Sequence, residues 1–98
     1  MNTTKTRGTI IRRELLSEGG NEYEYTLSVR ESEMTASYRL PLYSVGVKMR
    51  RSDGELSEAT IEDAFRSAEA AFRFFNLIVE NVATPIDLPF VFEDESLR

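Results

Sequence analysis

AFRSAEAAFRFFNLIVENV, residues 64–82, is the stretch that decides the fold. Its apolar residues recur at steps of three and four, which places them on one side of an α-helix. The residues of this apolar side are Ala64, Ala68, Ala71, Phe72, Phe75, Ile78, Val79 and Val82. Ser67 is a suitable N-cap, and Asn81 tolerates the left-handed conformation in which many helices end. The stretch therefore predicts an amphipathic helix that packs on a sheet and closes the hydrophobic core.

The residues before this helix alternate between apolar and polar, which is typical of antiparallel strands with one buried and one solvated face. Residues 23–31, YEYTLSVRE, show this most clearly. We predict strands at residues 8–16, 23–31, 34–40 and 42–51, joined by turns at Gly19-Gly20, Ser32-Glu33 and Asp53-Gly54. Pro41 predicts that its strand ends, bulges or lies at a sheet edge, because proline donates no ladder hydrogen bond. Residues 55–62 fit either a fifth strand or the beginning of a helix.

The residues after the main helix form a short closing segment. Thr84-Pro85 ends the helix, and residues 86–98, IDLPFVFEDESLR, fit a further helical turn or two or an extended segment across the core. In the helical alternative Asp87 is the cap and Pro89 lies early in the helix. The predicted fold class is α+β: an antiparallel meander of four or five strands, one long helix packed on one face, and this short C-terminal segment. At 98 residues we expect one domain, 1–98, with residues 1–7 as a disordered lead-in.

The composition argues against an enzyme. The chain contains no cysteine and no histidine, which removes disulfides, thiolate chemistry, the commonest general base and the commonest transition-metal ligand. The glycines form neither a P-loop nor a dinucleotide fingerprint. Carboxylates at residues 62–63 and 93–95 are the type that binds Mg²⁺ or Ca²⁺, but a solvated surface explains them more simply. We therefore expect no catalytic residue, no cofactor and no metal site.

The charge is divided unevenly along the chain. The net charge is −5, with +3 in residues 1–51 and −8 in residues 52–98. Arg39, Lys48 and Arg50 form a candidate basic face on the polar side of the sheet, which suits a nucleic acid or a small ligand. Glu22 and Glu24 are expected to share that face and to neutralise it by cross-strand pairing. A globally acidic chain also repels phosphate, so this is the alternative function.

The most unusual feature of the sequence is a surplus of hydrophobic residues in and after the main helix. Phe74 and Leu77 fall beside the main stripe of the helix, and Phe90 and Phe92 add more hydrophobic surface than one sheet face needs. In one alternative the C-terminal segment folds back and buries this surface. In the other, Phe74, Leu77, Phe90 and Phe92 form an interface with another protein or, in a homodimer, with a second copy. The second alternative predicts a small protein-interaction or regulatory adaptor domain.

The location expected from the sequence is the cytoplasm. The first sixteen residues, MNTTKTRGTIIRRELL, lack the apolar region of a signal peptide. No run approaches the roughly 20 apolar residues of a membrane span. We therefore expect no membrane contact.

Residues 43–94 also carry a resemblance. The matching segments are YSVGVK at 43–48, DGE at 53–55, IED at 61–63, ENVATPIDL at 80–88 and VFED at 91–94. Through them the chain resembles a family of small uncharacterised bacterial proteins of clostridial type, a domain of unknown function whose pattern closes with Glu-Asn-x-x-Thr-Pro-x-x-Leu and Val-x-Glu-Asp. It departs where the family's Tyr-Gly is spread to Tyr43-Ser-Val-Gly46, and where the frequent His after Ile86 is Asp87. The resemblance implies a common fold and a cytoplasmic setting, and no activity.

Overall fold

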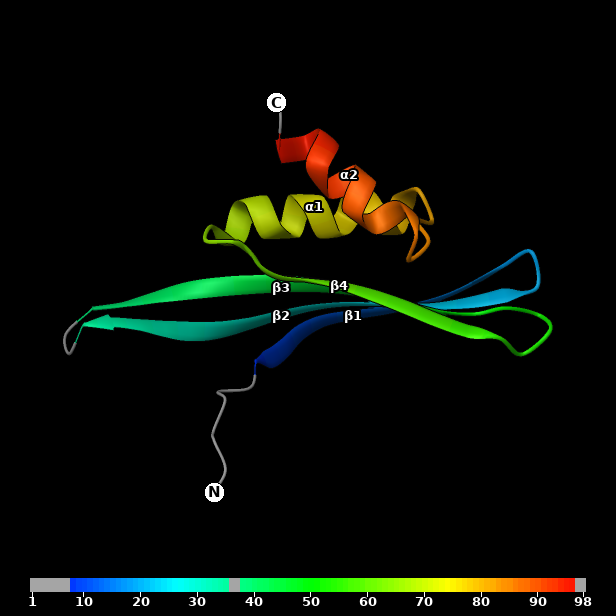
Figure 1. Ribbon diagram of the computed structural model, residues 1–98, viewed down its shortest axis with the longest axis horizontal. Helices are drawn as coiled ribbons and strands as arrows, with labels where there is room; N and C mark the ends of the chain where they lie inside the picture. The colour runs from blue at the N-terminus through cyan, green and yellow to red at the C-terminus, as the bar shows by residue number, and fades with distance from the viewer. Residues whose placement is uncertain (1–7, 36–37, 97–98) are drawn as a thin grey trace, which may run out of the picture.

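A computed structural model describes the backbone of residues 8–35 and 38–96 and the side chains of residues 8–31 and 40–95 (Figure 1). The elements are β1 (Thr9–Glu18), β2 (Asn21–Thr35), β3 (Tyr38–Arg50), β4 (Leu56–Phe65), α1 (Ala68–Glu80) and α2 (Asp87–Ser96). The strands form one antiparallel sheet in the order β1-β2-β3-β4. Both helices lie on the same side of this sheet (Figure 1). The predicted α+β meander is confirmed, with four strands.

The β2–β3 hairpin differs from the prediction. β2 continues through Ser32-Glu33, where we expected a connection, and ends at Thr35. β3 passes through Pro41, which faces Glu31 of β2. β4 pairs with β3 only from Tyr43 onwards, so Pro41 lies on a stretch of β3 that β4 does not cover. Of the three outcomes expected for this proline, the structure therefore shows the position at a sheet edge. The hairpin extends beyond β1 and β4 (Figure 1).

The ambiguous residues 55–62 belong to β4, which runs on to Phe65. Ala64 and Phe65 are therefore in a strand and not in the helix that the apolar spacing predicted. Pairing of Phe65 with Tyr43 of β3 gives these residues strand partners. Helix α1 begins where Ser67 accepts a hydrogen bond from the Ala70 N–H through its Oγ (3.2 Å), so the predicted N-cap is confirmed.

Helix α2 begins with a capping box in which the cap is Thr84 and not Asp87, the cap predicted from the sequence. The Asp87 N–H donates to Oγ1 of Thr84 (3.2 Å), and the Thr84 N–H donates back to the Asp87 carboxylate (3.1 Å). The first helical backbone bond runs from the Leu88 N–H to the Thr84 carbonyl (3.1 Å). Thr84 is thus the cap, Pro85 and Ile86 form the turn that leads into α2, and Asp87 is the first residue of α2 rather than its cap.

The core lies between the sheet and the helical layer. Strands β2 and β3 and both helices supply its largest fully buried side chains, which are Tyr25, Phe75, Leu27, Ile78, Leu88, Val45 and Val47. The strand residues of this set follow the predicted alternation, because Tyr25 faces Val47 and Leu27 faces Val45 across β2 and β3. Burial of such side chains is the main favourable term for a domain of this size.

Phe75 and Phe72 provide a test of this packing. Phe75 is fully buried, whereas Phe72 is half-buried at the border of the core beside Arg12. We expect Phe75→Ala to lower the free energy of unfolding by roughly 3–5 kcal/mol, because it leaves a cavity, and Phe72→Ala to cost clearly less. Urea unfolding followed by circular dichroism measures both. Equal losses at the two positions would contradict the placement of α1 on the sheet.

Candidate protein-binding surface

A buried tyrosine holds the connection between α1 and α2 against the sheet. Tyr25 lies in the middle of β2 with its side chain fully buried. Its hydroxyl donates a hydrogen bond to the carbonyl oxygen of Ala83 (2.9 Å), which belongs to the α1–α2 connection. Burial, and to a smaller extent the charges of Tyr23, Asp87 and Glu18, raise the pKa of Tyr25 to about 12. The phenol therefore stays a proton donor at all physiological pH values.

The connection is also closed by its own backbone. After the C-cap Asn81, the Ala83 N–H donates to the Ile78 carbonyl (2.9 Å) and the Val82 N–H to the Val79 carbonyl (3.2 Å), the two bonds of a Schellman motif. Val82 takes the left-handed position with φ of 49°. A β-branched residue rarely adopts this conformation. The tertiary contacts around Ala83 therefore stabilise a turn that Val82 alone disfavours.

An aromatic cluster joins both helices to β4. Phe65 of β4, Phe74 of α1 and Phe92 of α2 have ring centroids 5.3–5.8 Å apart, and Phe92 meets the other two edge to face. Such pairs stabilise packing by about 0.5–1.5 kcal/mol beyond the area they bury. Phe74 is only 3% exposed. The C-terminal segment thus folds back over this flank of α1, as the first of the two open alternatives predicted.

Two hollows lie beside α2. The first, of about 420 Å³, is lined by Phe65, Ala70, Arg73, Phe74, Asn76, Leu77, Glu80 and Glu95. The second, of about 370 Å³, is lined by Leu77, Ile78, Asn81, Ala83, Phe90, Val91, Asp94 and Glu95. Leu77 and Glu95 border both. Apolar side chains and carboxylates line both hollows, and Arg73 also borders the first.

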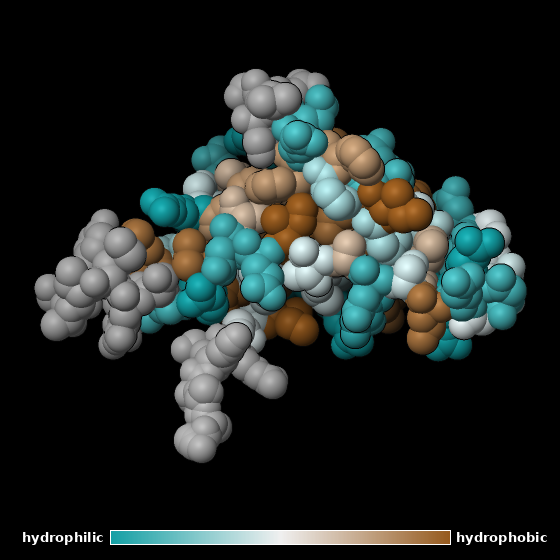
Figure 2. Space-filling model, viewed as in Figure 1, coloured by the Kyte–Doolittle hydropathy of each residue, from teal (hydrophilic) through white to brown (hydrophobic). Residues whose placement is uncertain are grey.

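The most exposed apolar side chains of the helical layer are those of Ile86 and Phe90. Phe90, which lines the second hollow, is 67% exposed, and Ile86 is more exposed still. Ile86 directly precedes α2 and lies four residues before Phe90, the spacing of neighbours along one side of a helix. Tan and brown atoms of apolar residues come to the surface of the helical layer among teal hydrophilic ones (Figure 2). We call Leu77, Ile86, Phe90 and Val91, with the second hollow, the α2 surface.

The four predicted interface residues therefore differ in burial and do not form one exposed surface. Phe74 lies in the core, so its prediction as an exposed interface residue is wrong. The helical periodicity considered only burial against the sheet, whereas α2 buries a second flank of α1 that includes Phe74. Phe92 is half-buried in the aromatic cluster, and Leu77 is half-buried between the hollows. Phe90 is exposed. Ile86, which belongs to the same surplus of apolar residues but is not one of the four predicted interface residues, is exposed as well.

The helical layer is strongly acidic. Residues 68–96 contain six carboxylate side chains and one basic residue, Arg73. Arg73 lies 3.4 Å from the Glu69 carboxylate, one turn earlier in α1. Glu80 is exposed at the rim of the first hollow. A field of this sign favours the approach of cationic groups.

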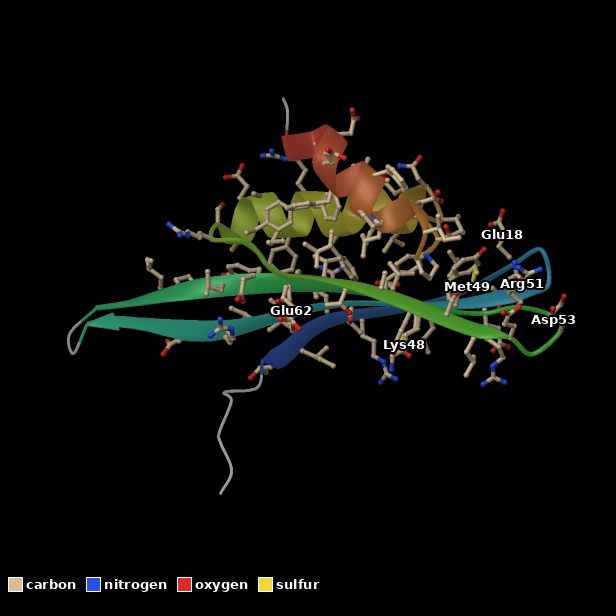
Figure 3. The ribbon with its side chains drawn as sticks, viewed as in Figure 1. Glu18, Lys48, Met49, Arg51, Asp53 and Glu62 are labelled. Atoms are coloured by element: carbon tan, nitrogen blue, oxygen red, sulfur yellow. The ribbon has the colours of Figure 1, made fainter. Side chains whose placement is uncertain are left out.

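The predicted basic face is neutralised where the structure describes it. Lys48 points away from the helices, and its neighbour Met49 points towards them (Figure 3). Lys48 lies between Glu24 and Glu58 in the sheet register, and Arg50 lies 3.9 Å from Glu22. Glu24 also accepts a hydrogen bond from the Arg13 Nε (2.6 Å). Positive and negative side chains therefore alternate on this face.

Arg39 is the third residue of the predicted basic face. It belongs to β3, opposite Glu33 of β2, and its side chain lies outside the described part of the chain.

The carboxylates at residues 62–63 have a structural role at Asp63. Arg30 donates two hydrogen bonds to the Asp63 carboxylate (3.1 and 2.7 Å), and these bonds raise the pKa of the guanidinium. Asp63 has φ of 53°, and its N–H donates to Oγ of Ser44 (2.9 Å) at a register shift of β4. Within the described residues no group of three or more potential metal ligands comes together.

The fold and this surface define a small α+β domain whose helical layer carries an apolar, acid-rimmed surface. The model of a family of unknown function, DUF6514, matches residues 6–96, and the chain belongs to this family. No curated protein and no solved structure matches it. Neither described helix has the length and apolar character needed to cross a membrane.

Alkaline unfolding tests the Tyr25 anchor. In the unfolded chain this phenol ionises around its ordinary pKa of 10.0, and in the folded protein only near 12. Its stabilising effect is complete below pH 10 and is lost as the pH rises to 12, a change of up to about 3 kcal/mol. We expect Tyr25→Phe to remove this part of the alkaline loss. At neutral pH the variant should lose about 1 kcal/mol or more, because the Ala83 carbonyl loses its partner.

Chemical denaturation at a series of pH values between 8 and 12, compared between wild type and Tyr25→Phe, measures the effect directly. Contributions that the two proteins share cancel in the difference. Parallel curves for the two proteins would show that the hydroxyl is not buried against Ala83.

Proposed function

We propose that this domain binds another protein through the α2 surface. The observation that carries the proposal is the exposure of Phe90, with Ile86 beside it, next to the hollow that Leu77 and Val91 line. Exposed apolar groups that border a concave site are characteristic of protein-binding surfaces. Large aromatic residues of this kind often supply most of the binding free energy.

The expected partner presents an apolar side chain flanked by lysine or arginine. The apolar group fits the second hollow, of about 370 Å³. The basic groups complement the acidic rim and the six carboxylates of residues 68–96. A nucleic acid is disfavoured on this side of the molecule by the same charge.

We propose a regulatory or adaptor role without catalysis, in the cytoplasm of a bacterium. The lack of histidine and cysteine in the sequence supports a role in binding rather than in acid–base or nucleophilic chemistry. The resemblance of residues 43–94 to proteins of clostridial type supports the bacterial, cytoplasmic setting.

Phe90→Glu tests the proposal, with Leu56→Glu as a matched control. Leu56 is 71% exposed at the beginning of β4, so the two substitutions remove similar exposed apolar groups at different places. We expect wild type and Leu56→Glu to retain the same partner protein from native lysate at high salt. Phe90→Glu should reduce its recovery about tenfold or more, because a carboxylate replaces a binding residue beside an acidic rim.

Retention of the same protein by Phe90→Glu would overturn the proposal. Nucleic acid that is captured at low salt and released as the salt rises would favour the sheet face instead. In that case Lys48→Glu with Arg50→Glu should abolish capture.

A further inference from the structure

The outer edge of β1 exposes apolar side chains. Ile10, Ile11 and Leu15 are all exposed, and Leu15 reaches 70%. β1 is a terminal strand of the sheet, and no described segment pairs with its outer side. Soluble proteins usually protect a long edge strand with charge, proline or a covering segment, because its free backbone groups pair readily with another strand. This edge therefore calls for an explanation.

The turn that follows β1 determines which backbone groups face outward. Gly19 and Gly20, both with positive φ, form a two-residue turn flanked by the pair Glu18 and Asn21. In such a turn the flanking pair is hydrogen bonded, and bonded and non-bonded pairs then alternate along the ladder. Counting back from Glu18, the residues whose N–H and C=O point away from β2 are Arg13, Leu15 and Ser17.

β1 is self-complementary around Arg13. If two copies of β1 pair antiparallel with a two-fold axis at Arg13, Arg12 of each copy lies opposite Glu14 of the other. Ile11, which has no partner in the β1–β2 register because of the shift between Ile10 and Arg12, then lies beside Leu15 of the second copy. Opposite charges and apolar pairs at facing positions stabilise a ladder by about 0.2–1 kcal/mol each. An axis at Arg12, Arg13 or Glu14 brings two like side chains together at the axis, but only the axis at Arg13 also pairs Arg12 of each copy with Glu14 of the other.

The environment of β1 leaves this pairing open. The Arg13 side chains, which meet at the axis, are each neutralised by Glu24 of their own chain at 2.6 Å. Helix α1 packs mainly on β2, β3 and β4. The Arg12 guanidinium lies 5.7 and 5.6 Å from the ring centroids of Phe72 and Phe75 of α1, but the side chains of Arg12 and Glu14 are still nearly half exposed on the helical side of β1. The paired strands can therefore approach without displacing a helix.

The opposite edge of the sheet is protected. The charged residues of β4 are all acidic: Glu58, Glu62 and Asp63. Asp63 also takes φ of 53° close to a register shift of β4; because β1 has a register shift of its own between Ile10 and Arg12, the two edges differ in charge rather than in regularity. Two β4 strands would therefore repel one another, as expected of an edge that avoids pairing. Of the two edge strands, β1 is therefore the one suited to pairing with a second copy.

We propose that β1 pairs antiparallel with β1 of a second copy around Arg13, so that two chains form one continuous eight-stranded sheet. The two-fold axis is perpendicular to the sheet, and both helical layers lie on the same side of it. This inference does not rest on the proposed function, because β1 contributes nothing to the α2 surface.

Charge exchange between two variants tests the pairing and its register. Arg12→Glu and Glu14→Arg each place like charges at both facing positions of the homodimer. We expect each variant alone to weaken dimerisation roughly tenfold or more. A one-to-one mixture should restore dimers, because position 12 of each variant then faces the opposite charge at position 14 of the other. Sedimentation velocity over a concentration series up to ~1 mM measures all four samples, wild type included.

Two further variants secure the interpretation. Leu15→Lys removes the exposed apolar contact without touching the core, and it should yield single chains with an unchanged circular dichroism spectrum. Arg51→Glu reverses an exposed charge in the β3–β4 turn, beside the far end of β1 and away from the proposed axis at Arg13, and should leave dimerisation unchanged. A wild-type protein of single-chain mass throughout the series overturns the proposal. Dimers that persist in either charge variant alone overturn the register and with it the β1 contact.

Discussion

The hydrogen bond from Tyr25 to Ala83 joins the middle of the sheet to the connection between the helices, and the position of α2 depends on it. Ala83 lies one residue after Val82, whose left-handed conformation is unfavourable for a β-branched side chain. Because the tyrosine hydroxyl is buried, its removal leaves a buried carbonyl without a partner. The turn is therefore held by the sheet rather than by its own sequence, and it directs α2 back across α1. From that placement follow the burial of Phe74 and the hollows beside α2.

Local sequence signals account for most of the fold. Ser67 as an N-cap, the glycine turns at 19–20 and 53–54, and the alternation of residues 23–31 each specify a local conformation by a known mechanism. The prediction failed where two conformations have the same local signal. The chain reverses between Thr35 and Tyr38, where no glycine, proline, asparagine or aspartate marks a turn and the alternation continues on both sides. Ala64 and Phe65 fit the helical spacing as well as a strand, and pairing with β3 decides between them.

The candidate site was less predictable, because it depends on how the elements pack on one another. A helix on a sheet has one buried face, and on that assumption Phe74 is exposed. The second helix buries a second flank of α1, and its placement rests on the Thr84 cap and on a tyrosine 58 residues before Ala83. The basic face depends on the assembled sheet in the same way, because the register of three strands places Glu24 and Glu58 on either side of Lys48.

The two proposed contacts have a combined consequence that neither has alone. In the β1-paired dimer both helical layers lie on one side of the sheet, so the two α2 surfaces face the same direction. A partner that carries two basic, apolar segments then binds the second after the first as an intramolecular step, and its avidity exceeds the affinity of either contact. A partner with one segment gains nothing from the dimer. The acidic charge of the helical layers acts in the same sense, because two such layers side by side strengthen the field that attracts a cationic partner and repel nucleic acid more strongly. Dimerisation would then determine which partners the domain retains, although the β1 edge touches none of them.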